Sequence, residues 1–507
     1  MEITSMMPIY AMLASLIGGF LLLFFGKRPN VRDGISLAAS VAKFAIVLSM
    51  VPIVLSGGQI VHTFFELIPD SGLEIKFKVD AFGLFFALLA SFLWIITTVY
   101  AVGYMRALKE HAQTRFFFCF AISLFAALGI AFSANLLTMF VFYEILSLIT
   151  YPLVIHEGNR ESMRNGTKYL IYLVGTSIAF QMVAIILIYV TAGTLDFTEA
   201  SGIMAESSAS PLMQTVIFLL LVAGYAKAGI MPFHSWLPSA MVAPTPVSAL
   251  LHAVAVVVAG VFCVLRTVFH IYGPEQMQFL GLDLILGVLV SITILVSIIF
   301  ALTRDNLKAR IAYSTVNQLS IMMLGAAMLT YNGMLGGVLH IASHSFAKIT
   351  LFFCAGAIFV ATGKKAISQL SGIGKKMPFT MLAFFIGTLG IAGAPPALGL
   401  ISKVYMATGA VWADPATGEP FAMMGIGLLC VLLASALLDI ICFFPIVYRA
   451  FFKELPDGES GDRQEAPLMV LVPLLITAIV TMILFFYPYA FYELAKLTVE
   501  GIGGGIR

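Results

Sequence analysis

Charged side chains are scarce in this sequence. Asp, Glu, Lys and Arg supply 11% of the 507 residues, and 60% of the residues are hydrophobic. A soluble domain usually has about 25% charged residues. With a mean hydropathy of +1.01, this composition excludes a soluble globular protein. The long apolar runs predict an all-α polytopic membrane protein, because a helix satisfies its own backbone hydrogen bonds inside a bilayer.

Cysteine is also rare, and nucleotide-binding motifs are absent. The five cysteines all fall inside apolar runs, and no two have the spacing of metal ligands. The glycine-rich segments GIGGGIR and SGIGKK fit neither the dinucleotide fingerprint nor the P-loop. We therefore expect no cofactor, no metal and no redox or catalytic centre in this chain, and no nucleic-acid partner.

Fourteen apolar runs are long enough to cross a bilayer as helices, at about 20 residues per crossing. The first run lacks the basic region and the small-residue cleavage site of a signal peptide, so we expect it to be a span. The expected spans begin near Ser5, Gly34, Asp80, Arg115, Ala134, Lys168, Pro211, Thr245, Gly281, Arg310, Asn332, Pro378, Phe421 and Pro467.

The basic residues alternate between loops. If the N-terminus is outside, the odd-numbered loops are cytoplasmic, and they hold 19 of the 28 Lys and Arg residues. The even-numbered loops hold only Lys76 and Lys78, with Arg266 near a helix end. Under the positive-inside rule, this asymmetry predicts a multi-pass protein of the cell inner (plasma) membrane with both termini outside.

A few ionisable residues remain inside the expected spans. A charge in the hydrocarbon region costs at least about 2.5–3.5 kcal/mol, so such residues are expected to face protein or water. They comprise four lysines, two acids and three histidines: Lys43, Lys227, Lys348, Lys403, Glu144, Asp439, His252, His340 and His344. Lys43 lies near the cytoplasmic end of its span, and we expect it to snorkel to the surface without a transport role.

Two of these lysines lie beside prolines. Lys227 precedes Pro232 by five residues, and Lys403 follows the pair that begins with Pro395. Interrupted helices at matching places in two halves of a membrane chain indicate a transport site. The sequence therefore predicts broken helices 7 and 12. The alternatives are a snorkelling role for Lys227 and a helix-capping role for Lys403.

The remaining polar residues suggest a path for protons. His340, His344 and Lys348 recur every four residues and share one helical face, which favours a wet proton-relaying stripe. Metal binding by the two histidines and plain helix–helix hydrogen bonding are alternatives. Glu144 either tethers a neighbouring helix or modulates a lysine by approaching and withdrawing. Asp439 is equally compatible with a structural and a relay role.

Four segments resemble one family. They read KAGIMPFHSWLPSAMVAPTPVSALLHA, which begins at Lys227, RIAYSTVNQLSIMML, HIASHSFAKITLFFCAG and GIAGAPPALGLISK. Together they look like the antiporter-like subunits shared by respiratory complex I, membrane-bound hydrogenases and Mrp-type Na+/H+ antiporters. The likeness covers roughly residues 80–450. The absence of a lateral helix makes the chain look like the D-type Mrp or hydrogenase-type subunit.

The resemblance implies a division of the chain and a role for each buried residue. Residues 1–110 would hold helices 1–3, residues 111–272 and 273–450 would form two inverted five-helix repeats, and residues 451–507 would hold helix 14. Glu144 would be the acid paired with Lys227, the central proton-carrying lysine. His252 would be the next relay, Lys348 the central bridge and Lys403 the terminal group of the far channel.

One position departs from the family pattern. Some relatives read AVVKAG where this chain reads AVVVAG, with Val258 in place of the lysine. Either His252 carries the bridging proton site, or this half-channel is weakened.

The favoured function is a proton-translocating subunit of a hetero-oligomeric membrane complex that moves H+ and, in an Mrp-type complex, exchanges it for Na+. A pumping subunit of a hydrogenase or a complex I-like quinone reductase is the first alternative. A stand-alone solute transporter and a structural subunit with vestigial charges are the others.

Overall fold

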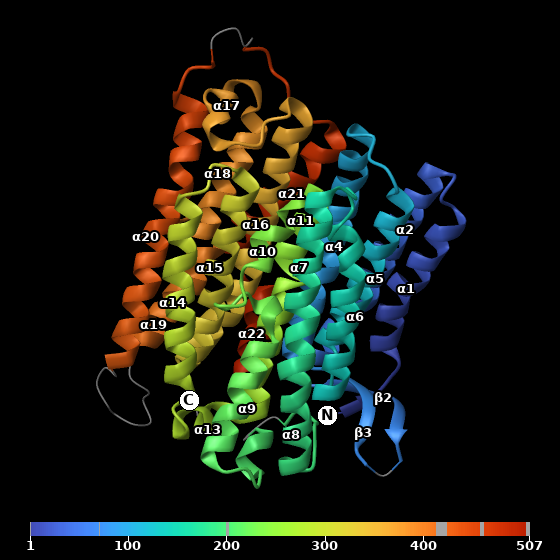
Figure 1. Ribbon diagram of the computed structural model, residues 1–507, viewed down its shortest axis with the longest axis vertical. Helices are drawn as coiled ribbons and strands as arrows, with labels where there is room; N and C mark the ends of the chain where they lie inside the picture. The colour runs from blue at the N-terminus through green and yellow to red at the C-terminus, as the bar shows by residue number, and fades with distance from the viewer. Residues whose placement is uncertain (1, 70, 199–201, 412–422, 457–460, 503–507) are drawn as a thin grey trace.

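The computed structural model describes residues 2–69, 71–198, 202–411, 423–456 and 461–502. Most of these residues form helices that run side by side along the long axis of the molecule (Figure 1). The expectation of an all-α polytopic fold is confirmed. Eleven helical segments among the described residues are long and apolar enough to cross a membrane.

The first part of the chain, through residue 107, contains three strands and four helices: β1 (Glu2–Thr4), α1 (Met7–Phe24), α2 (Pro29–Ser49), α3 (Val51–Leu55), β2 (Gln59–Ile68), β3 (Leu73–Val79) and α4 (Ala81–Ala107). The next part contains α5 (Gln113–Ala131), α6 (Leu136–Val154), α7 (Arg160–Thr176), α8 (Met182–Ala192), α9 (Pro211–Gly224), α10 (Trp236–Ser239), α11 (Thr245–Leu250), α12 (Val257–Arg266) and α13 (Gly273–Phe279).

The second half contains α14 (Leu282–Leu302), α15 (Leu307–Ala327), α16 (Tyr331–Thr362), α17 (Ile373–Lys376), α18 (Pro378–Ala392), α19 (Leu398–Val411), α20 (Met423–Phe452), α21 (Leu468–Phe486) and α22 (Tyr489–Ile502). Short 3-10 and π-helical turns connect several of these helices: η1 (Ser177–Gln181), η2 (Ile203–Glu206), η3 (Ala226–Ala228), η4 (Ala240–Val242), η5 (Leu251–Ala255), η6 (Thr267–Tyr272) and η7 (Ile367–Leu370).

The expected spans that are not among the eleven long apolar segments coincide with α9, with α15 and with the pair α18–α19. Helix α9 and the helices of the pair are too short individually to cross a bilayer. The number of fourteen spans and the two inverted repeats therefore stay predictions. The expected start at Phe421 lies outside the described residues.

A small sheet is a feature that the sequence did not predict. Strand β2 pairs in parallel with β1 and antiparallel with β3, and register shifts interrupt the second ladder. The sequence LEIKFKV of β3 alternates between more and less buried residues, which is the period of a strand. Because the segment is short and lies between two apolar runs, it was expected to be a loop.

Several helices begin at residues that satisfy free N–H groups. The side chain of Asn135 accepts from Thr138 N at 2.7 Å, and Asn159 accepts from Ser162 N at the same distance. Asn and Asp at these positions stabilise a helix start, because the first N–H groups have no partner within the helix. Asp80 serves α4 in this way.

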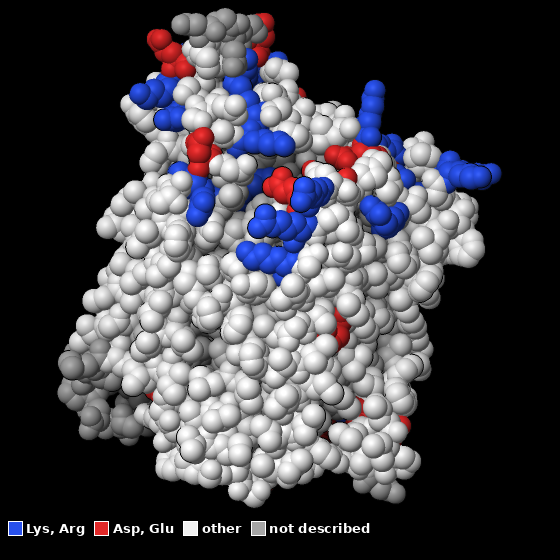
Figure 2. Space-filling view, viewed as in Figure 1, with Lys and Arg blue, Asp and Glu red and all other residues white. Residues whose placement is uncertain are grey.

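The outer surface of the bundle is apolar over its middle. Large apolar side chains such as Leu433 and Leu437 on α20 and Ile292 on α14 are exposed. Figure 2 shows Lys and Arg gathered at the end that holds α17, above a broad band of uncharged residues. This distribution matches a bilayer-embedded protein with one strongly basic face.

The buried position of Lys43 contradicts the expectation that it snorkels. Lys43 is 0% exposed, its Nζ donates to the carbonyl of Leu124 on α5 at 2.8 Å, and it lies 5.0 Å from the centroid of the Trp94 ring on α4. Helix α2 faces α4 and α5 at this point, so the side chain has protein around it where the sequence suggested open surface.

We predict that Lys43→Met leaves transport intact and the folded protein as stable as wild type or more stable. The Leu124 carbonyl is already bonded within α5, and no ion pair of Lys43 occurs among the described residues. Replacing a buried charge with an apolar residue of similar shape is often neutral or stabilising. Thermal unfolding in detergent and a vesicle transport assay check this. A loss of transport would place Lys43 on a conduction path.

Candidate functional site

The first broken helix ends earlier than Pro232. Helix α9 stops at Gly224, and Lys227 lies in the 3-10 turn η3 that follows. Gly229 has a φ of +71°, a conformation that glycine adopts at no steric cost. The indole N–H of Trp236 donates to the carbonyl of Ala226 at 2.9 Å and so satisfies one acceptor that the break exposes. Lys227 is therefore part of the break itself.

The second broken helix supplies acceptors for Lys403. Pro395 and Pro396 lack the N–H groups that would bond the carbonyls of Ile391 and Ala392 four residues earlier. The Nζ atom of Lys403, in α19, donates to these two carbonyls at 2.8 and 3.1 Å. The prolines thus free two carbonyls that bind a buried ammonium group. Unlike Lys227, Lys403 lies beyond its break, inside the following helix.

Asp439 on α20 serves two lysines. Its Oδ2 lies 3.8 Å from Lys403 Nζ. Its Oδ1 accepts a hydrogen bond from Ser314 Oγ at 3.5 Å, and Ser314 Oγ accepts one from Lys348 Nζ at 2.7 Å. Lys348 also donates to the carbonyl of Ile311 at 3.3 Å. Asp439 and Lys348 are fully buried, so one carboxylate connects two lysines, directly on one side and through a hydroxyl on the other.

Gln318 joins Asp439 to the histidine stripe of α16. Its Nε2 donates to Asp439 Oδ2 at 2.7 Å, and its Oε1 lies 2.9 Å from His340 Nε2. The other ring nitrogen of His340 is hydrogen-bonded to Ser402 Oγ at 2.9 Å. Ser402 precedes Lys403, so the chain of hydrogen bonds returns to its starting point. Because both nitrogens of His340 are engaged, the geometry argues against metal binding by His340 and His344.

His344 connects this network to the first half of the chain. Its Nε2 is hydrogen-bonded to the backbone carbonyl of His252 at 3.1 Å, and Ser345 Oγ donates to the carbonyl of Ala253 at 2.8 Å. Both carbonyls belong to the π-helical turn η5. The ring of His252 packs against Phe352, and neither ring nitrogen has a hydrogen-bond partner. Such buried groups are uncommon, and they give His252 spare hydrogen-bonding capacity.

In the first half, helix α6 holds the Lys227 ammonium group. Lys227 Nζ donates to the carbonyl of Tyr143 at 2.7 Å and to Ser147 Oγ at 2.6 Å. It also lies 3.0 Å from the centroid of the Tyr143 ring, in a cation–π contact. Tyr143 and Ser147 are one helical turn apart, so they face Lys227 together.

Glu144 does not contact Lys227, although the two were expected to be partners. It is half-buried and follows Tyr143, which turns it away from the face that Lys227 occupies. No ion pair shorter than 4.0 Å joins Glu144 to Lys227 among the described side chains, and Glu144 Oε1 has no hydrogen-bond partner. The two groups interact electrostatically through space.

The link between Lys227 and His252 is apolar. Val258 on α12 is fully buried, and no hydrogen bond joins Lys227 to His252 within the part of the chain that the structure describes. Gly260 lies on the same helix and packs directly on Lys227: a Cβ atom there would lie 2.8 Å from Lys227 Cβ and still closer to its backbone and to Ala228 N.

We predict that Gly260→Ala lowers both transport and stability, because the new methyl group displaces the backbone that carries Lys227. Overpacking of this kind typically costs about 1–3 kcal/mol. The matched control is Gly175→Ala in α7, where a Cβ meets nothing within 4 Å and the higher helix propensity of alanine favours the fold. Thermal unfolding and vesicle transport check both variants. Equal behaviour of the two would show that contact with Gly260 does not position Lys227.

Two cavities lie at the ends of the helical run that carries His252. A cavity of about 510 Å³ is lined by Thr245 at the start of this run and by Glu110, Glu157 and Lys308. A cavity of about 300 Å³ is lined by residues near the other end of the run and by the segments around α3, β2 and α22. The run from Thr245 to Phe279 therefore extends between two cavities through the fully buried interior.

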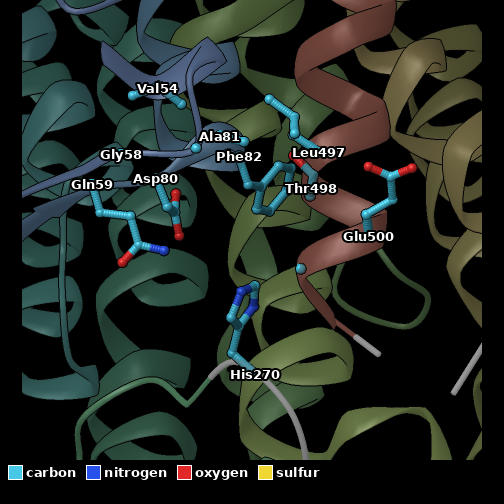
Figure 3. A pocket seen from close by; sticks show the side chains of 12 residues that line it. Val54, Gly58, Gln59, Asp80, Ala81, Phe82, His270, Leu497, Thr498 and Glu500 are labelled. Atoms are coloured by element: carbon cyan, nitrogen blue, oxygen red, sulfur yellow. The ribbon is translucent and has the colours of Figure 1, made fainter. Parts of the chain in front are cut away.

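The smaller cavity is bordered by an ion pair. Figure 3 shows Asp80, His270 and Glu500 around it. The two oxygens of Asp80 accept from the guanidinium of Arg266 at 2.5 and 2.8 Å, and Arg266 also contacts His270 Nε2 at 3.1 Å. Burial by itself would raise the pKa of Asp80, but Arg266 outweighs it and holds that pKa below its usual value. Asp80 is thus a charged partner that fixes Arg266.

Sequence reasoning missed the hydroxyl and amide groups of the site. Ser314 and Gln318 lie four residues apart on α15 and face Asp439 together. Tyr143 and Ser147 repeat this spacing on α6. Polar residues spaced by four inside an apolar run were the available signal. Such residues are common in membrane helices, where they also bond their own backbone, so the spacing by itself does not identify them.

A helical membrane bundle whose interior holds a line of lysines, acids and histidines defines an ion-translocating type of membrane protein, because such groups are costly in a bilayer. The family model described as "NADH:quinone oxidoreductase/Mrp antiporter, TM" matches residues 133–428. The chain belongs to this family.

Individual relatives come from both branches of the family. NADH-quinone oxidoreductase subunit N of Desulforudis audaxviator is 30% identical over 431 residues, which is 82% of each chain. A probable K(+)/H(+) antiporter protein of Rhizobium meliloti is 31% identical over 368 residues. That alignment covers 72% of this chain but 36% of the relative, so this chain spans about a third of its length.

A solved structure has the same fold. A chain of the Mrp complex from Dietzia sp. superposes with a TM-score of 0.85 at 20% sequence identity, and the match covers 98% of this chain and 97% of that one. The two chains therefore share their fold over nearly their full lengths.

Proposed function

We propose that this chain is the proton-translocating, antiporter-like subunit of a multi-subunit ion-pumping complex in the plasma membrane, with both termini outside. In this proposal protons move along Glu144, Lys227, His252, Lys348 and Lys403. His340, His344, Asp439 and the breaks at Pro232 and Pro395 support that path. The chain itself carries no cofactor.

The observation that carries the proposal is the closed hydrogen-bonded network of the second half. It runs from Lys348 through Ser314 to Asp439, and from there both to Lys403 and through Gln318 and His340 to Ser402. These groups are buried or nearly so. A purely structural cluster needs no titratable group at each step, whereas proton transfer requires groups that gain and lose protons within hydrogen-bond reach.

The first half supplies the second lysine station. Lys227 is held by neutral groups on α6, and Glu144 lies near it without an ion pair. An acid that approaches Lys227 favours its protonated state, and one that withdraws favours release of the proton. Because Val258 leaves no polar link to His252, transfer between the two halves depends on water that reaches the η5 turn.

The two broken helices support two repeats, residues 111–272 and 273–450. Each proposed repeat contains one interrupted helix and one buried lysine beside it. The helices of one repeat need not match the other residue by residue, since Lys227 lies within its break and Lys403 follows its break.

The proposed partners are other integral membrane subunits. The antiporter relative suggests exchange of H+ for a monovalent cation such as Na+ or K+, as in an Mrp-type complex with this chain in a D-type position. The quinone oxidoreductase relative, which aligns over 82% of its own length, favours redox-driven pumping as the second candidate. Both need the same proton path in this chain and differ in the neighbouring subunit that drives it.

The test uses the purified complex that contains this chain, reconstituted into liposomes with an internal pH indicator. Wild type should move protons when Na+ or K+ is added, or when a quinone substrate is reduced if the second candidate holds. The combined variant Glu144→Gln, Lys227→Met, Lys348→Met and Lys403→Met should assemble without moving protons. Unchanged proton movement in that variant would refute the proposal. Full activity of the isolated chain would instead indicate a stand-alone transporter.

A further inference from the structure

Three potential metal ligands meet at the basic end of the bundle, away from the lysine network. Glu110 and His111 lie in the turn between α4 and α5, and His156 follows the last turn of α6. Glu110 Oε2 lies 3.8 Å from His156 Nε2 and 3.9 Å from His111 Nδ1. One ligand atom from each residue lies within 4.8 Å of the other two.

His156 has the environment of a ligand that lacks its ion. Its side chain is 0% exposed, and neither ring nitrogen has a hydrogen-bond partner among the described residues. Buried polar side chains nearly always have such partners, so two free nitrogens on one buried ring call for an explanation. The ring is held in place by Phe116, edge-on at 5.6 Å, and by His111, stacked at 4.7 Å.

The turn that carries the other two groups has a defined shape. Lys109 and Ala112 flank Glu110 and His111, and both have positive φ values, 52° and 47°. Such values are uncommon for residues other than glycine. Gln113 Nε2 donates to the carbonyl of Glu110 at 3.0 Å, and its Oε1 accepts from Arg32 at 2.8 Å. These contacts hold the turn against the end of α6.

We propose that Glu110, His111 and His156 form a binding site for a divalent transition-metal ion of the Zn2+ type. Two imidazoles and one carboxylate are a known zinc set, with a fourth position left for water. Zinc bonds of about 2.0–2.2 Å place tetrahedral ligand atoms a little over 3 Å apart, so the observed separations need only a small closure. Imidazole ligands select against Ca2+ and Mg2+, which prefer oxygen.

The local charges and access fit this assignment. Glu110 also lines the cavity of about 510 Å³, which gives an ion a route from solvent. Glu157 lines the same cavity and adds a second carboxylate nearby. Arg115 is the neighbouring cation, and its guanidinium contacts the backbone carbonyl of His156 at 3.5 Å, away from the ring nitrogens. A bound ion would tie the α4–α5 turn to the end of α6, whether or not the chain moves protons.

The experiment measures Zn2+ binding to the full chain in detergent, purified without a histidine tag, by competition with a chromophoric chelator. Wild type should bind one Zn2+ per chain, and excess Ca2+ should not displace it. His111→Ala is the main variant because His111 is exposed and its removal leaves the core intact. We expect affinity to fall at least as far as the roughly 10–100-fold loss seen when groups that merely support a ligand are removed.

Two further variants complete the test. Glu110→Gln should weaken Zn2+ binding in the same way, whereas His62→Ala, a histidine in β2 on the sheet, should leave it unchanged. With Co2+ as the probe, wild type should show the visible absorption of a four-coordinate ion, and His111→Ala should lose it. The proposal is overturned if wild type binds no more Zn2+ than the detergent blank. It is equally overturned if His111→Ala and Glu110→Gln bind Zn2+ as wild type does.

Discussion

Lys227→Met should abolish proton transport while the complex still assembles. Removal of a group that gains and loses the transported proton is expected to slow transport by about 100-fold or more, the size of a general acid–base contribution. The fold should tolerate the change. Ser147 Oγ already donates to the carbonyl of Tyr143 at 3.0 Å, so no buried polar group is left without a partner. The methionine side chain also occupies much of the lysine volume.

The matched control for this variant is Lys43→Met, which removes an equally buried lysine from outside the proposed path. Both variants should yield complexes of normal size in detergent and normal thermal stability. In liposomes with an internal pH indicator, only Lys227→Met should fail. Proton transport at the wild-type rate by Lys227→Met would remove this lysine from the mechanism, even if the other lysines prove essential.

Asp439→Asn should reduce transport as strongly and, unlike Lys227→Met, should also destabilise the protein. Asp439 is the carboxylate that faces both Lys403 and, through Ser314, Lys348. An asparagine can still accept from Gln318, so the hydrogen bonds survive but the negative charge is lost. Removing one partner of a buried ion pair typically costs roughly 3–5 kcal/mol. The two lysines are then expected to release their protons, which stops their cycling.

Asp439→Glu is the conservative control, since it keeps the charge and lengthens the side chain by one methylene. It should restore part of the transport rate and most of the stability. Thermal unfolding separates the two effects, because a purely structural Asp439 predicts loss of stability with normal transport per assembled complex. If Asp439→Asn transports protons normally, the network of the second half is not the proton path.

The sequence identified most of the ionisable residues of the site but few of their contacts. Lys227, Lys348, Lys403 and Asp439 were recognisable because a charge in an apolar run is conspicuous. The contacts were not, since the partners lie far apart along the chain: Ser314 and Asp439 are 125 residues apart, and His340 and Ser402 are 62 apart. Which face of one helix meets which face of another is decided by packing.

Two differences follow from the same limit. Glu144 was paired with Lys227 because both are isolated charges, yet the rotation of α6 places Tyr143 and Ser147 against the lysine. Lys43 was assigned to the surface from its distance to the end of its span, whereas neighbouring helices cover it.

The proposed metal ligands show this limit most clearly. Glu110 and His111 lie 45 or more residues from His156, in segments with no metal-binding spacing. Neither segment contains a pattern that the sequence could reveal, and only the contact between the α4–α5 turn and the end of α6 brings the three side chains together.

By itself, the sequence determined the membrane class, the approximate spans, the two broken helices and the family. Each of these depends on composition, local hydropathy or short motifs, which are properties of neighbouring residues. The tertiary structure decided that the prolines before Lys403 free the carbonyls that bind it, that Asp439 serves two lysines, and that Lys227 and His252 have no polar link. Those facts depend on the rotation and depth of each helix, which are set by the packing of the whole bundle.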